Sequence, residues 1–304
     1  MSFPLLILGA GYTGKVLARQ AREESRSVFA TTSNQESQAY LEDLGVQVFD
    51  FDVLNPGGEL PLPPDFEGDL DVVYSVPTLF RDYDEAPSGE LARHVEPLAE
   101  VLGLLKTRAE LRVRTFLYFS STSVYGDHHG KVITEESTRH PTAPFGKMRR
   151  DIEDFLLQEE EIPTAIGRIV GIYGPDRTLE KRIQDPSFRL VDGGSKVTNR
   201  IHVEDLARAI LFLLEKKAPE RVYNLSDGAP LTVKALVDFV VKAQGLTPPE
   251  EESLQEYGDR KKDPNLLARW KSSALISNDR LKRLGFSFQY PDAMKGYEAL
   301  FKDS

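Results

Sequence analysis

The stretch Leu5-Leu6-Ile7-Leu8-Gly9-Ala10-Gly11-Tyr12-Thr13-Gly14 decides the fold of this chain. Its four consecutive apolar residues predict a buried strand, and the glycines that follow have the spacing G-x-G-x-x-G. The segment from Lys15 to Glu24 predicts the helix that such a turn opens. A strand, a glycine turn and a helix in this order begin a Rossmann unit, which binds dinucleotides.

Each position of the turn has a physical role in holding a pyrophosphate. Gly9 permits the tight turn, Gly11 lets the backbone approach the phosphates, and Gly14 lets the helix lie close to the strand. The N–H groups of Tyr12, Thr13 and the rest of the first helical turn attract the anion, together with the positive end of the helix dipole. The alternative is a glycine-rich turn without a ligand.

The rest of the first half continues the alternation of strands and helices. After the first helix we expect strands at residues 27–30, 46–49, 71–76 and 115–119 and helices at 37–44 and 89–106. Strands and helices at this spacing predict an α/β fold, a doubly wound parallel sheet with helices on both faces. The Pro- and Gly-rich segment 55–69 predicts a surface loop.

The second half has a different pattern. We expect strands at 164–170 and 221–225, helices at 203–216 and 232–244, and a charged loop at 248–260. No clean linker divides the halves. We therefore expect a dinucleotide-binding Rossmann domain over residues 1–165, interleaved with a smaller substrate-binding α/β lobe over residues 166–304.

Composition excludes several classes of function. The chain has 304 residues and a net charge of −10, which argues against a general nucleic-acid binder. It has no cysteine, which excludes disulfides, thiolate metal sites and cysteine nucleophiles, and its five histidines have no metal-binding spacing. The apolar run Leu5–Leu8 is too short for a signal peptide or a membrane span. We expect a cytoplasmic protein with no metal and no membrane partner.

The end of the second expected strand bears on the choice of cofactor. It reads Ala30-Thr31-Thr32-Ser33-Asn34 and lacks the acid that holds the ribose of NAD. Thr31, Thr32 and Ser33 offer hydrogen bonds to a 2′-phosphate, and Lys15 adds charge, although no arginine stands there. We expect NADP or NAD, with NADP favoured. Asp52, after the third strand, is a candidate for a contact near the adenine, or else a solvated loop acid.

Hydroxyl groups follow the strand that ends at Phe119. The segment Ser120-Ser121-Thr122-Ser123-Val124-Tyr125-Gly126 lies at the carboxyl end of a parallel strand, where such sheets bind ligands. With the glycine turn, it resembles the S-S-x-x-V-Y-G motif of the extended short-chain dehydrogenase/reductase family, which includes nucleotide-sugar epimerases, dehydratases and reductases. The resemblance continues in three later segments, Arg168–Pro175, Asn199–Ala207 and Asn278–Pro291.

The resemblance implies a catalytic serine, tyrosine and lysine. It assigns the serine to Ser121, but it places Phe145 at the tyrosine and Arg149 at the lysine. A phenylalanine cannot transfer a proton, whereas an arginine keeps its charge and can hold a ribose or a phosphate. The chain therefore resembles the atypical members of the family that lack the Y-x-x-x-K pair.

Three explanations of the missing tyrosine remain open. Another residue supplies the proton, with Tyr125 as the first candidate and Tyr173 as the second. His128 and His129 are further candidates, because histidine as a residue type gains or loses a proton near neutral pH. Alternatively, they are exposed loop residues. Alternatively, the protein binds a dinucleotide without turnover, or its chemistry needs no phenolate.

The resemblance also implies a substrate site and a dimer. We place Tyr173 and Arg200 in the substrate site, where Arg200 meets a substrate phosphate, while His202 and Asp205 organise the turn. Helices at 89–106 and 149–159 match those that pair in homodimers of the family. The function we expect is an NAD(P)-dependent oxidoreductase or epimerase acting on a nucleotide-sugar-like substrate. The alternative is a catalytically silent NAD(P)(H)-binding sensor or regulatory protein.

Overall fold

A computed structural model describes residues 2–77, 80, 82–84 and 90–302. Seven strands form one sheet in the order β12-β7-β5-β4-β1-β2-β3. They are β1 (Leu5–Leu8), β2 (Val28–Thr31), β3 (Gln47–Phe49), β4 (Gly68–Tyr74), β5 (Leu111–Ser121), β7 (Thr164–Ile169) and β12 (Val222–Leu225). The chain proceeds outward in one direction from β1 to β3 and in the other from β4, so the strand order reverses between β1 and β4. Ligands of doubly wound sheets bind at the carboxyl ends of the strands beside such a reversal.

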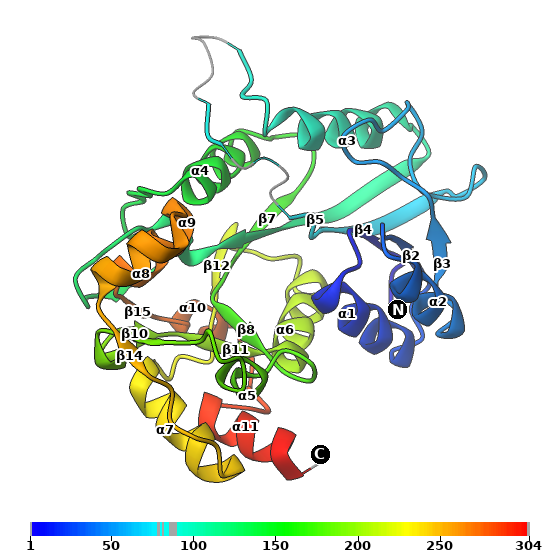
Figure 1. Ribbon diagram of the computed structural model, residues 1–304. Coiled ribbons are helices and arrows are strands. Elements are labelled where there is room, and N and C mark those ends of the chain that lie inside the picture. Colours follow the sequence, from blue (N-terminus) through cyan, green and yellow to red (C-terminus); the bar gives the residue numbers. More distant parts are fainter. Residues whose placement is uncertain (1, 78–79, 81, 85–89, 303–304) are drawn as a thin grey trace. The chain divides into compact units, whose positions relative to one another are not determined.

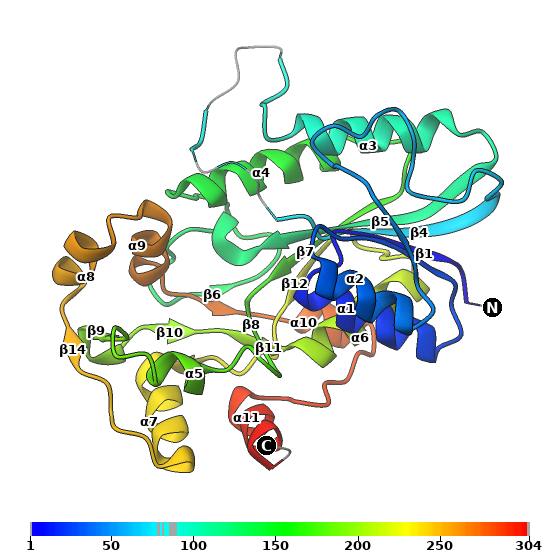
Figure 2. The same ribbon diagram turned by 45° about the vertical axis from the view of Figure 1, so that its right-hand side comes forward.

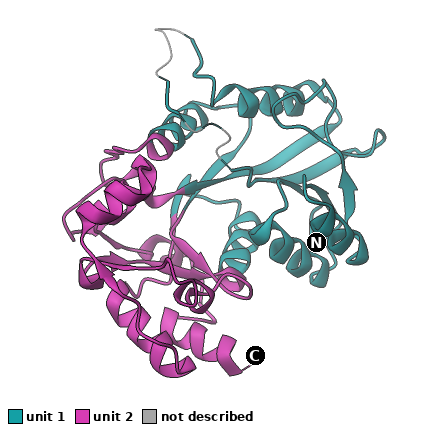
Figure 3. Ribbon diagram, viewed as in Figure 1, with its two compact units in different colours: residues 1–120, 147–168, 206–223 teal, residues 121–146, 169–205, 224–304 magenta. Residues whose placement is uncertain are grey.

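The chain divides into two compact units that alternate along the sequence (Figure 3). Unit 1 contains residues 1–120, 147–168 and 206–223, and unit 2 contains residues 121–146, 169–205 and 224–304. The division at residue 165 that we expect from the sequence stays a prediction.

The helices of unit 1 cover both faces of its sheet. They are α1 (Tyr12–Glu23), α2 (Gln35–Asp43), α3 (Glu96–Thr107) and most of α4 (Pro144–Leu157) and α6 (Val203–Glu215). Figures 1 and 2 show α3 and α4 on one face and α1, α2 and α6 on the other. The doubly wound parallel sheet that the sequence predicts is confirmed. No helix in the described part of the chain is long and apolar enough to span a bilayer.

The core of unit 1 is centred on β1, whose four side chains are completely buried. On one face of the sheet, Tyr74, Phe116 and Tyr118 lie in the same apolar cluster as the buried side of α3. Each fully buried large apolar side chain contributes about 1.5–3 kcal/mol, so this cluster fixes the strands that end at the predicted ligand-binding edge.

Unit 2 contains several two-stranded sheets and short helices. Its strands are β6 (Val132–Ile133), β8 (Gly171–Tyr173), β9 (Leu190–Val191), β10 (Val197–Thr198), β11 (Arg200–His202), β13 (Leu231–Thr232), β14 (Glu251–Glu252) and β15 (Leu275–Ile276). Its helices are η1 (Thr122–Val124), α5 (Leu179–Ile183), η2 (Asp192–Gly194), α7 (Val233–Gln244), α8 (Leu254–Lys261), α9 (Pro264–Lys271), α10 (Asp279–Arg283) and α11 (Ala293–Lys302). The parallel pair β8 and β11 places Tyr173 beside His202 and Gly171 beside Arg200.

Several expected helices begin at other residues in the structure, and α1 and α3 are two of them. α1 begins at Tyr12, directly after the glycine turn, and not at Lys15. α3 begins at Glu96, with Pro97 in its first turn, where the fixed φ of proline suits a helix. Of the earlier residues assigned to it, 90–95 are not helical and Gly89 lies outside the described residues.

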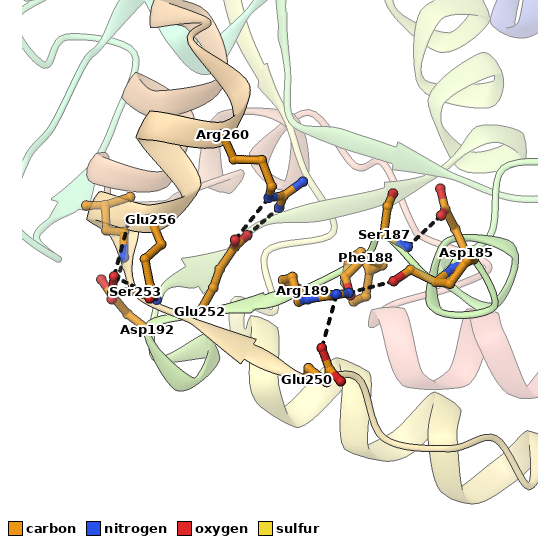
Figure 4. A network of polar contacts seen from close by, with 12 residues as sticks. Asp185, Ser187, Phe188, Arg189, Asp192, Glu250, Glu252, Ser253, Glu256 and Arg260 are labelled. Carbon is orange, nitrogen blue, oxygen red and sulfur yellow. Dashed lines mark hydrogen bonds and ion pairs between the residues drawn. The ribbon is translucent and has the colours of Figure 1, made fainter.

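The expected loop at 248–260 is wrong, because this segment contains β14 and α8. Ser253 and Glu256 form a capping box in which each side chain accepts a hydrogen bond from the other residue's backbone N–H. Glu252 pairs with Arg260 at 2.5 Å, and Asp192 Oδ1 accepts a hydrogen bond from the N–H of Leu254 at 2.8 Å (Figure 4). The high charge that suggested a loop belongs to the solvated face of a capped helix.

A buried polar network joins α4 to two strands of unit 1. Glu153 is completely buried and accepts hydrogen bonds from Ser120 Oγ at 2.6 Å and from Arg168 Nη2 at 2.7 Å. Arg168 is itself only 2% exposed. Because a buried carboxylate is costly without its partners, this network fixes the angle at which α4 lies on the sheet.

We expect Glu153→Gln to lower the free energy of unfolding by about 3–5 kcal/mol, because it leaves the Arg168 charge buried without a counter-charge. Urea unfolding followed by circular dichroism measures this loss. The control is Glu23→Gln in the exposed Arg19–Glu23 pair of α1, for which we expect a loss of less than about 1 kcal/mol. Equal losses in the two variants would contradict the role given to the buried network.

Candidate functional site

The three glycines of the turn have the geometry that pyrophosphate binding requires. Gly9 has φ +87°, and a Cβ there would lie 3.0 Å from the backbone N of Val76. A Cβ on Gly14 would lie 3.3 Å from the Cβ of Ala10, so the helix and the turn are in close contact. A Cβ on Gly11 would meet nothing within 4 Å, so the space beside this residue is open. The turn therefore fits the phosphates of a dinucleotide.

Thr31 supports this turn from the end of β2. Its Oγ1 accepts a hydrogen bond from the N–H of Gly9 at 3.0 Å, its carbonyl accepts one from Ala10 at 2.7 Å, and its side chain is buried. Thr32 is half-buried, and its hydroxyl accepts a hydrogen bond from Asn34 at 3.3 Å, whereas Ser33 is exposed. Of the three predicted cofactor-binding hydroxyls, that of Thr31 is thus already engaged in holding the glycine turn.

Two other residues that the sequence nominates for the cofactor lie on the surface of unit 1. Lys15 Nζ lies 5.6 Å from the ring centroid of Tyr40. Asp52 is exposed, and its carboxylate accepts hydrogen bonds from Leu54 N at 2.9 Å and Asn55 Nδ2 at 3.0 Å, which lower its pKa. The Asp52 carboxylate thus organises its own loop, and its contact with an adenine stays a prediction.

Phe145 and Arg149 lie one turn apart on α4. The Phe145 side chain is 37% exposed, which is unusual for so large an apolar group, and its backbone N–H donates to Asn265 Oδ1 at 3.0 Å. Arg149 Nη1 donates to the carbonyl of Phe119 at 3.1 Å, at the carboxyl end of β5. The charge of Arg149 is therefore fixed at the strand end where the family resemblance places a catalytic cation.

Ser121 lies at the start of η1. Its Oγ accepts a hydrogen bond from the N–H of Ser123 at 3.2 Å, and the residue remains partly exposed. The hydroxyl hydrogen is free to point elsewhere, so Ser121 can donate a hydrogen bond to a ligand oxygen. Its catalytic role stays a prediction.

Tyr125, the first candidate for proton transfer, is completely buried. Its hydroxyl donates to Asn224 Oδ1 at 2.7 Å. The nearby His128 Nε2 lies 3.1 Å from the carbonyl of Thr138, and the exposed His129 pairs with Asp127 at 3.0 Å. Proton transfer to a ligand by Tyr125 would require its hydroxyl to leave Asn224 and reach solvent.

Tyr173, the second candidate, lies in the core of unit 2. Its ring stacks on Tyr297 with centroids 5.0 Å apart, and it is 1% exposed. Burial and the nearby carboxylate of Asp227 raise the pKa of Tyr173. This direction opposes the formation of a phenolate, so Tyr173 is poorly suited to act as a base near neutral pH.

Arg200 and His202 lie on β11, before α6. His202 Nδ1 accepts a hydrogen bond from the N–H of Glu204 at 3.2 Å, and Asp205 accepts hydrogen bonds from the backbone of Gln289 at 2.8 Å and Tyr290 at 2.7 Å. His202 thus holds the backbone where α6 begins, whereas Asp205 holds the distant segment at Gln289 and Tyr290, so a shared role in the turn stays a prediction. Arg200 has a different environment, because its Nε is buried without a hydrogen-bond partner.

Sequence reasoning missed a cluster of cations around Arg200 in unit 2. We define the cation cluster as Lys196, Arg200 and Arg269, whose pKa values are lowered, together with Arg177 and Arg182, whose charges contribute to that lowering. Burial lowers the pKa of Arg200, and the charge of Arg182 lowers it further. These residues come from separate strands, helices and loops, so no local sequence pattern brings them together.

Asp227 is a buried acid whose charge acts on Arg200 of this cluster. Its backbone N–H donates to the carbonyl of Arg200 at 2.9 Å, and its Oδ2 is buried without a hydrogen-bond partner. Burial raises the pKa of Asp227 to about 7. A carboxyl group that is half-neutral at pH 7 compensates the cluster only partly, so this part of unit 2 favours an anionic ligand.

The sequence and fold have clear counterparts among known proteins. Residues 5–226 match the NAD dependent epimerase/dehydratase family. Because this match covers most of the chain, the chain belongs to that family. The resemblance to the extended short-chain dehydrogenase/reductase family that the motifs indicated is confirmed. The name of the matched family specifies NAD, which is a nicotinamide cofactor.

Two curated relatives illustrate the range of the similarity. Protein YeeZ of Escherichia coli K12 is 26% identical over 289 residues, which cover 95% of this chain and 96% of that protein. A 4-hydroxy-2-methyl-3-oxo-4-farnesyl-3,4-dihydroquinoline-1-oxide ketoreductase of Stigmatella aurantiaca is 26% identical over 251 residues, which cover 78% of this chain and 72% of that protein.

Solved structures share the fold over the whole chain. A conserved protein of unknown function from Silicibacter pomeroyi is 26% identical with a TM-score of 0.79, and the match covers 100% of this chain and 99% of that one. The UDP-glucuronic acid 4-epimerase of Bacillus cereus, in complex with UDP-glucuronic acid and NAD, is 17% identical with a TM-score of 0.74 and 99% of each chain covered. The second likeness shows the fold alone.

We expect Gly11→Ala to weaken cofactor binding at least about tenfold without a loss of stability, because a methyl group there fills space intended for phosphate and touches no protein atom. Gly9→Ala is the contrasting variant. It should lower the free energy of unfolding by about 1–3 kcal/mol, because a side chain at this positive φ is strained and meets Val76. Cofactor titration and thermal unfolding of both variants separate the two effects, and unchanged cofactor affinity in Gly11→Ala would refute the assignment.

Proposed function

We propose that this chain is an oxidoreductase or epimerase that binds a nicotinamide dinucleotide at Gly9–Gly14 and a nucleotide-sugar-like substrate in unit 2. The observation that carries the proposal is the open space beside Gly11 at the start of α1. Membership of the NAD dependent epimerase/dehydratase family supports it. A nicotinamide dinucleotide supplies hydride transfer in such enzymes.

The substrate half of the proposal is supported by the cation cluster. Arg200 has a buried Nε with no partner, and an unpaired buried donor costs about 1–3 kcal/mol unless a ligand or water satisfies it. Charge-assisted hydrogen bonds from guanidinium groups suit phosphate oxygens. The diphosphate of a nucleotide sugar has the charge that such a cluster attracts. The B. cereus epimerase of the same fold is described in complex with UDP-glucuronic acid.

The chemistry of the reacting carbon involves Ser121 and Arg149. Ser121 Oγ has a hydrogen available to donate to a substrate oxygen, because its known hydrogen bond is one that it accepts. Arg149 provides a fixed positive charge at the end of β5. Neither Ser121 nor Arg149 accepts a proton readily at neutral pH. We therefore propose that the proton released from the substrate hydroxyl passes to solvent water.

A second candidate function is a dinucleotide-binding sensor that performs no turnover. Phe145 at the tyrosine position favours it, and so do the buried hydroxyl of Tyr125 and the raised pKa of Tyr173. A mutant of the B. cereus epimerase in which a tyrosine is replaced by phenylalanine is described in complex with NAD and a fluorinated sugar nucleotide. That description is consistent with ligand binding when a tyrosine is lost.

We expect the reduced cofactor bound to the wild-type protein to be oxidised by at least one 4-keto sugar nucleotide, as followed by nicotinamide absorbance in a single turnover. Ser121→Ala should slow this step at least about a hundredfold, because it removes the hydrogen-bond donor to the carbonyl. The double variant Phe145→Tyr/Arg149→Lys restores the family's pair and should accelerate it. Tight cofactor binding without oxidation in all three proteins would establish the sensor, and absence of cofactor binding would refute both candidates.

We propose NADP as the preferred cofactor, since residues 31–34 contain no acid and Lys15 supplies a cation in the first turns of α1. Lys15→Gln should weaken NADP binding about three- to tenfold through the loss of one exposed charge contact, and should leave NAD binding nearly unchanged. Competition titrations with both dinucleotides measure the ratio. An equal effect on the two cofactors would contradict a role of Lys15 at the 2′-phosphate.

A further inference from the structure

A pocket in unit 1 lies near the starts of β7 and β12, whereas the glycine turn follows the carboxyl end of β1. Its volume is about 390 Å³, which is within the range of small-molecule sites and more than ten times the volume of one water, about 30 Å³. Its walls are formed by the segment between α4 and β7, the segment between α6 and β12, and Thr115 of β5. All of these residues belong to unit 1, so the pocket is complete within that unit.

Thr115 contributes a buried hydroxyl group to this pocket. The residue is 1% exposed, and its Oγ1 has no hydrogen-bond partner in the part of the chain that the structure describes. Thr164, which also lines the pocket, differs because its hydroxyl donates to the carbonyl of Leu156 at 3.0 Å. A buried hydroxyl without a partner is costly, and a ligand oxygen in the pocket would satisfy the one on Thr115.

Two cations that line the pocket have no carboxylate within ion-pair distance among the described residues. Arg221 is half-buried, and its guanidinium donates only to carbonyl groups at the end of α4 and to Thr164 Oγ1. Lys217 is exposed at the pocket. Arg112 pairs with Asp69 at 2.5 Å and lowers its pKa, and Lys217 acts on this carboxyl group only at longer range. Both cations can therefore receive an anion.

The carboxylates that line the pocket do not cancel these charges. Glu159 Oε2 pairs with Lys106 Nζ at 2.9 Å, and its Oε1 accepts hydrogen bonds from the N–H groups of Glu161 at 2.8 Å and Ile162 at 3.1 Å. The charge of Glu159 is thus offset by Lys106, and Glu160 is exposed. A net positive charge remains on the lining, so the pocket favours a ligand with one negative charge.

The rest of the lining is apolar. Ile162, Pro163 and Ala218 line the pocket, and the side chains of Ile162 and Ala218 are buried. A hydrocarbon group that covers these side chains leaves water, which favours binding by about 25 cal/mol per Å² of apolar surface removed from water. A ligand that suits both parts of the lining has one anionic group and a short hydrocarbon part.

We propose that this pocket binds a short-chain monocarboxylate. Lys217, Arg221 and the hydroxyl of Thr115 are the donors that receive its carboxylate, and its hydrocarbon part packs on Ile162 and Ala218. Hydrogen bonds from cations to a carboxylate are among the stronger ones in proteins. The pocket shares no residue with the glycine turn or with the cation cluster, so this inference goes beyond the proposed function and does not depend on it.

Calorimetric titration of the full chain with butyrate tests the proposal in the absence of dinucleotide and nucleotide sugar. We expect butyrate to bind, and we expect butyramide and butylamine, which have a neutral and a cationic group on a similar hydrocarbon, to bind at least about tenfold more weakly. Hydrogen exchange locates the ligand. Butyrate should protect residues 156–166 and 214–223 and should leave residues 9–24 unchanged.

Four variants test the assigned contacts. Thr115→Val should weaken butyrate binding at least about fivefold, because it removes a buried donor. Lys217→Gln should weaken it about three- to tenfold, and Glu160→Gln should strengthen it about twofold, because the first loses an attractive charge and the second a repulsive one. Lys234→Gln, at an exposed lysine of α7, is the control and should leave the affinity unchanged.

Unfolding in urea tests the state of the Thr115 hydroxyl separately. Without ligand, Thr115→Val should not lower the unfolding midpoint, because the hydroxyl that it removes has no partner among the described residues. Thr164→Val should lower the midpoint, because it removes the hydrogen bond to Leu156. Butyrate should raise the midpoint of the wild-type protein and have little effect on that of Thr115→Val.

Four results would each overturn the proposal. They are the absence of butyrate binding, equal affinity for butyrate and butyramide, unchanged affinity in folded Thr115→Val, and exchange protection confined to segments outside the pocket. Circular dichroism establishes that each variant is folded. Because these assays contain neither dinucleotide nor nucleotide sugar, a protein that binds butyrate here but fails the turnover assay would refute the proposed enzyme and keep this site.

Discussion

The contact between the glycine turn and the end of β2 is the constraint on which the dinucleotide site depends. Gly9 adopts a φ of +87°, and its N–H is held by the hydroxyl of Thr31. This hydrogen bond and the close approach of Gly14 to Ala10 direct the N-terminus of α1 toward the carboxyl ends of the strands. The N–H groups that are proposed to receive phosphate are therefore oriented by the fold itself, which would reduce the entropy lost on binding.

Buried charged side chains have different roles in the two units. In unit 1, the charge of Glu153 is buried beside Arg168, so it supports the fold and offers nothing to a ligand. In unit 2, the cations of the cluster repel one another, and burial raises the pKa of the neighbouring Asp227 to about 7. A charge arrangement that is unfavourable in the free protein is a common property of sites where a ligand completes the balance.

The sequence predicted the elements whose determinants are local and missed those that depend on distant partners. The strand at Leu5–Leu8 and the glycine turn follow from consecutive residues and backbone requirements. The charge of residues 248–260 predicts a loop, whereas the capping box of Ser253 and Glu256 begins α8 within this segment. The burial of Tyr125 depends on Asn224, 99 residues away, and the cation cluster depends on residues from several elements. Such long-range contacts leave no periodic signal in one sequence.

The position of Thr31 has a consequence for how cofactor choice can change during evolution. A carboxylate at this residue would place a negative charge in a buried position and remove the hydroxyl that holds Gly9. The acid that selects NAD in other dinucleotide-binding folds would therefore disturb the turn itself if it arose here. Only the more exposed Thr32 and Ser33 can change without that penalty. If residues 31–33 hold the ribose as proposed, changes at Thr32 and Ser33 are the ones that leave the turn intact.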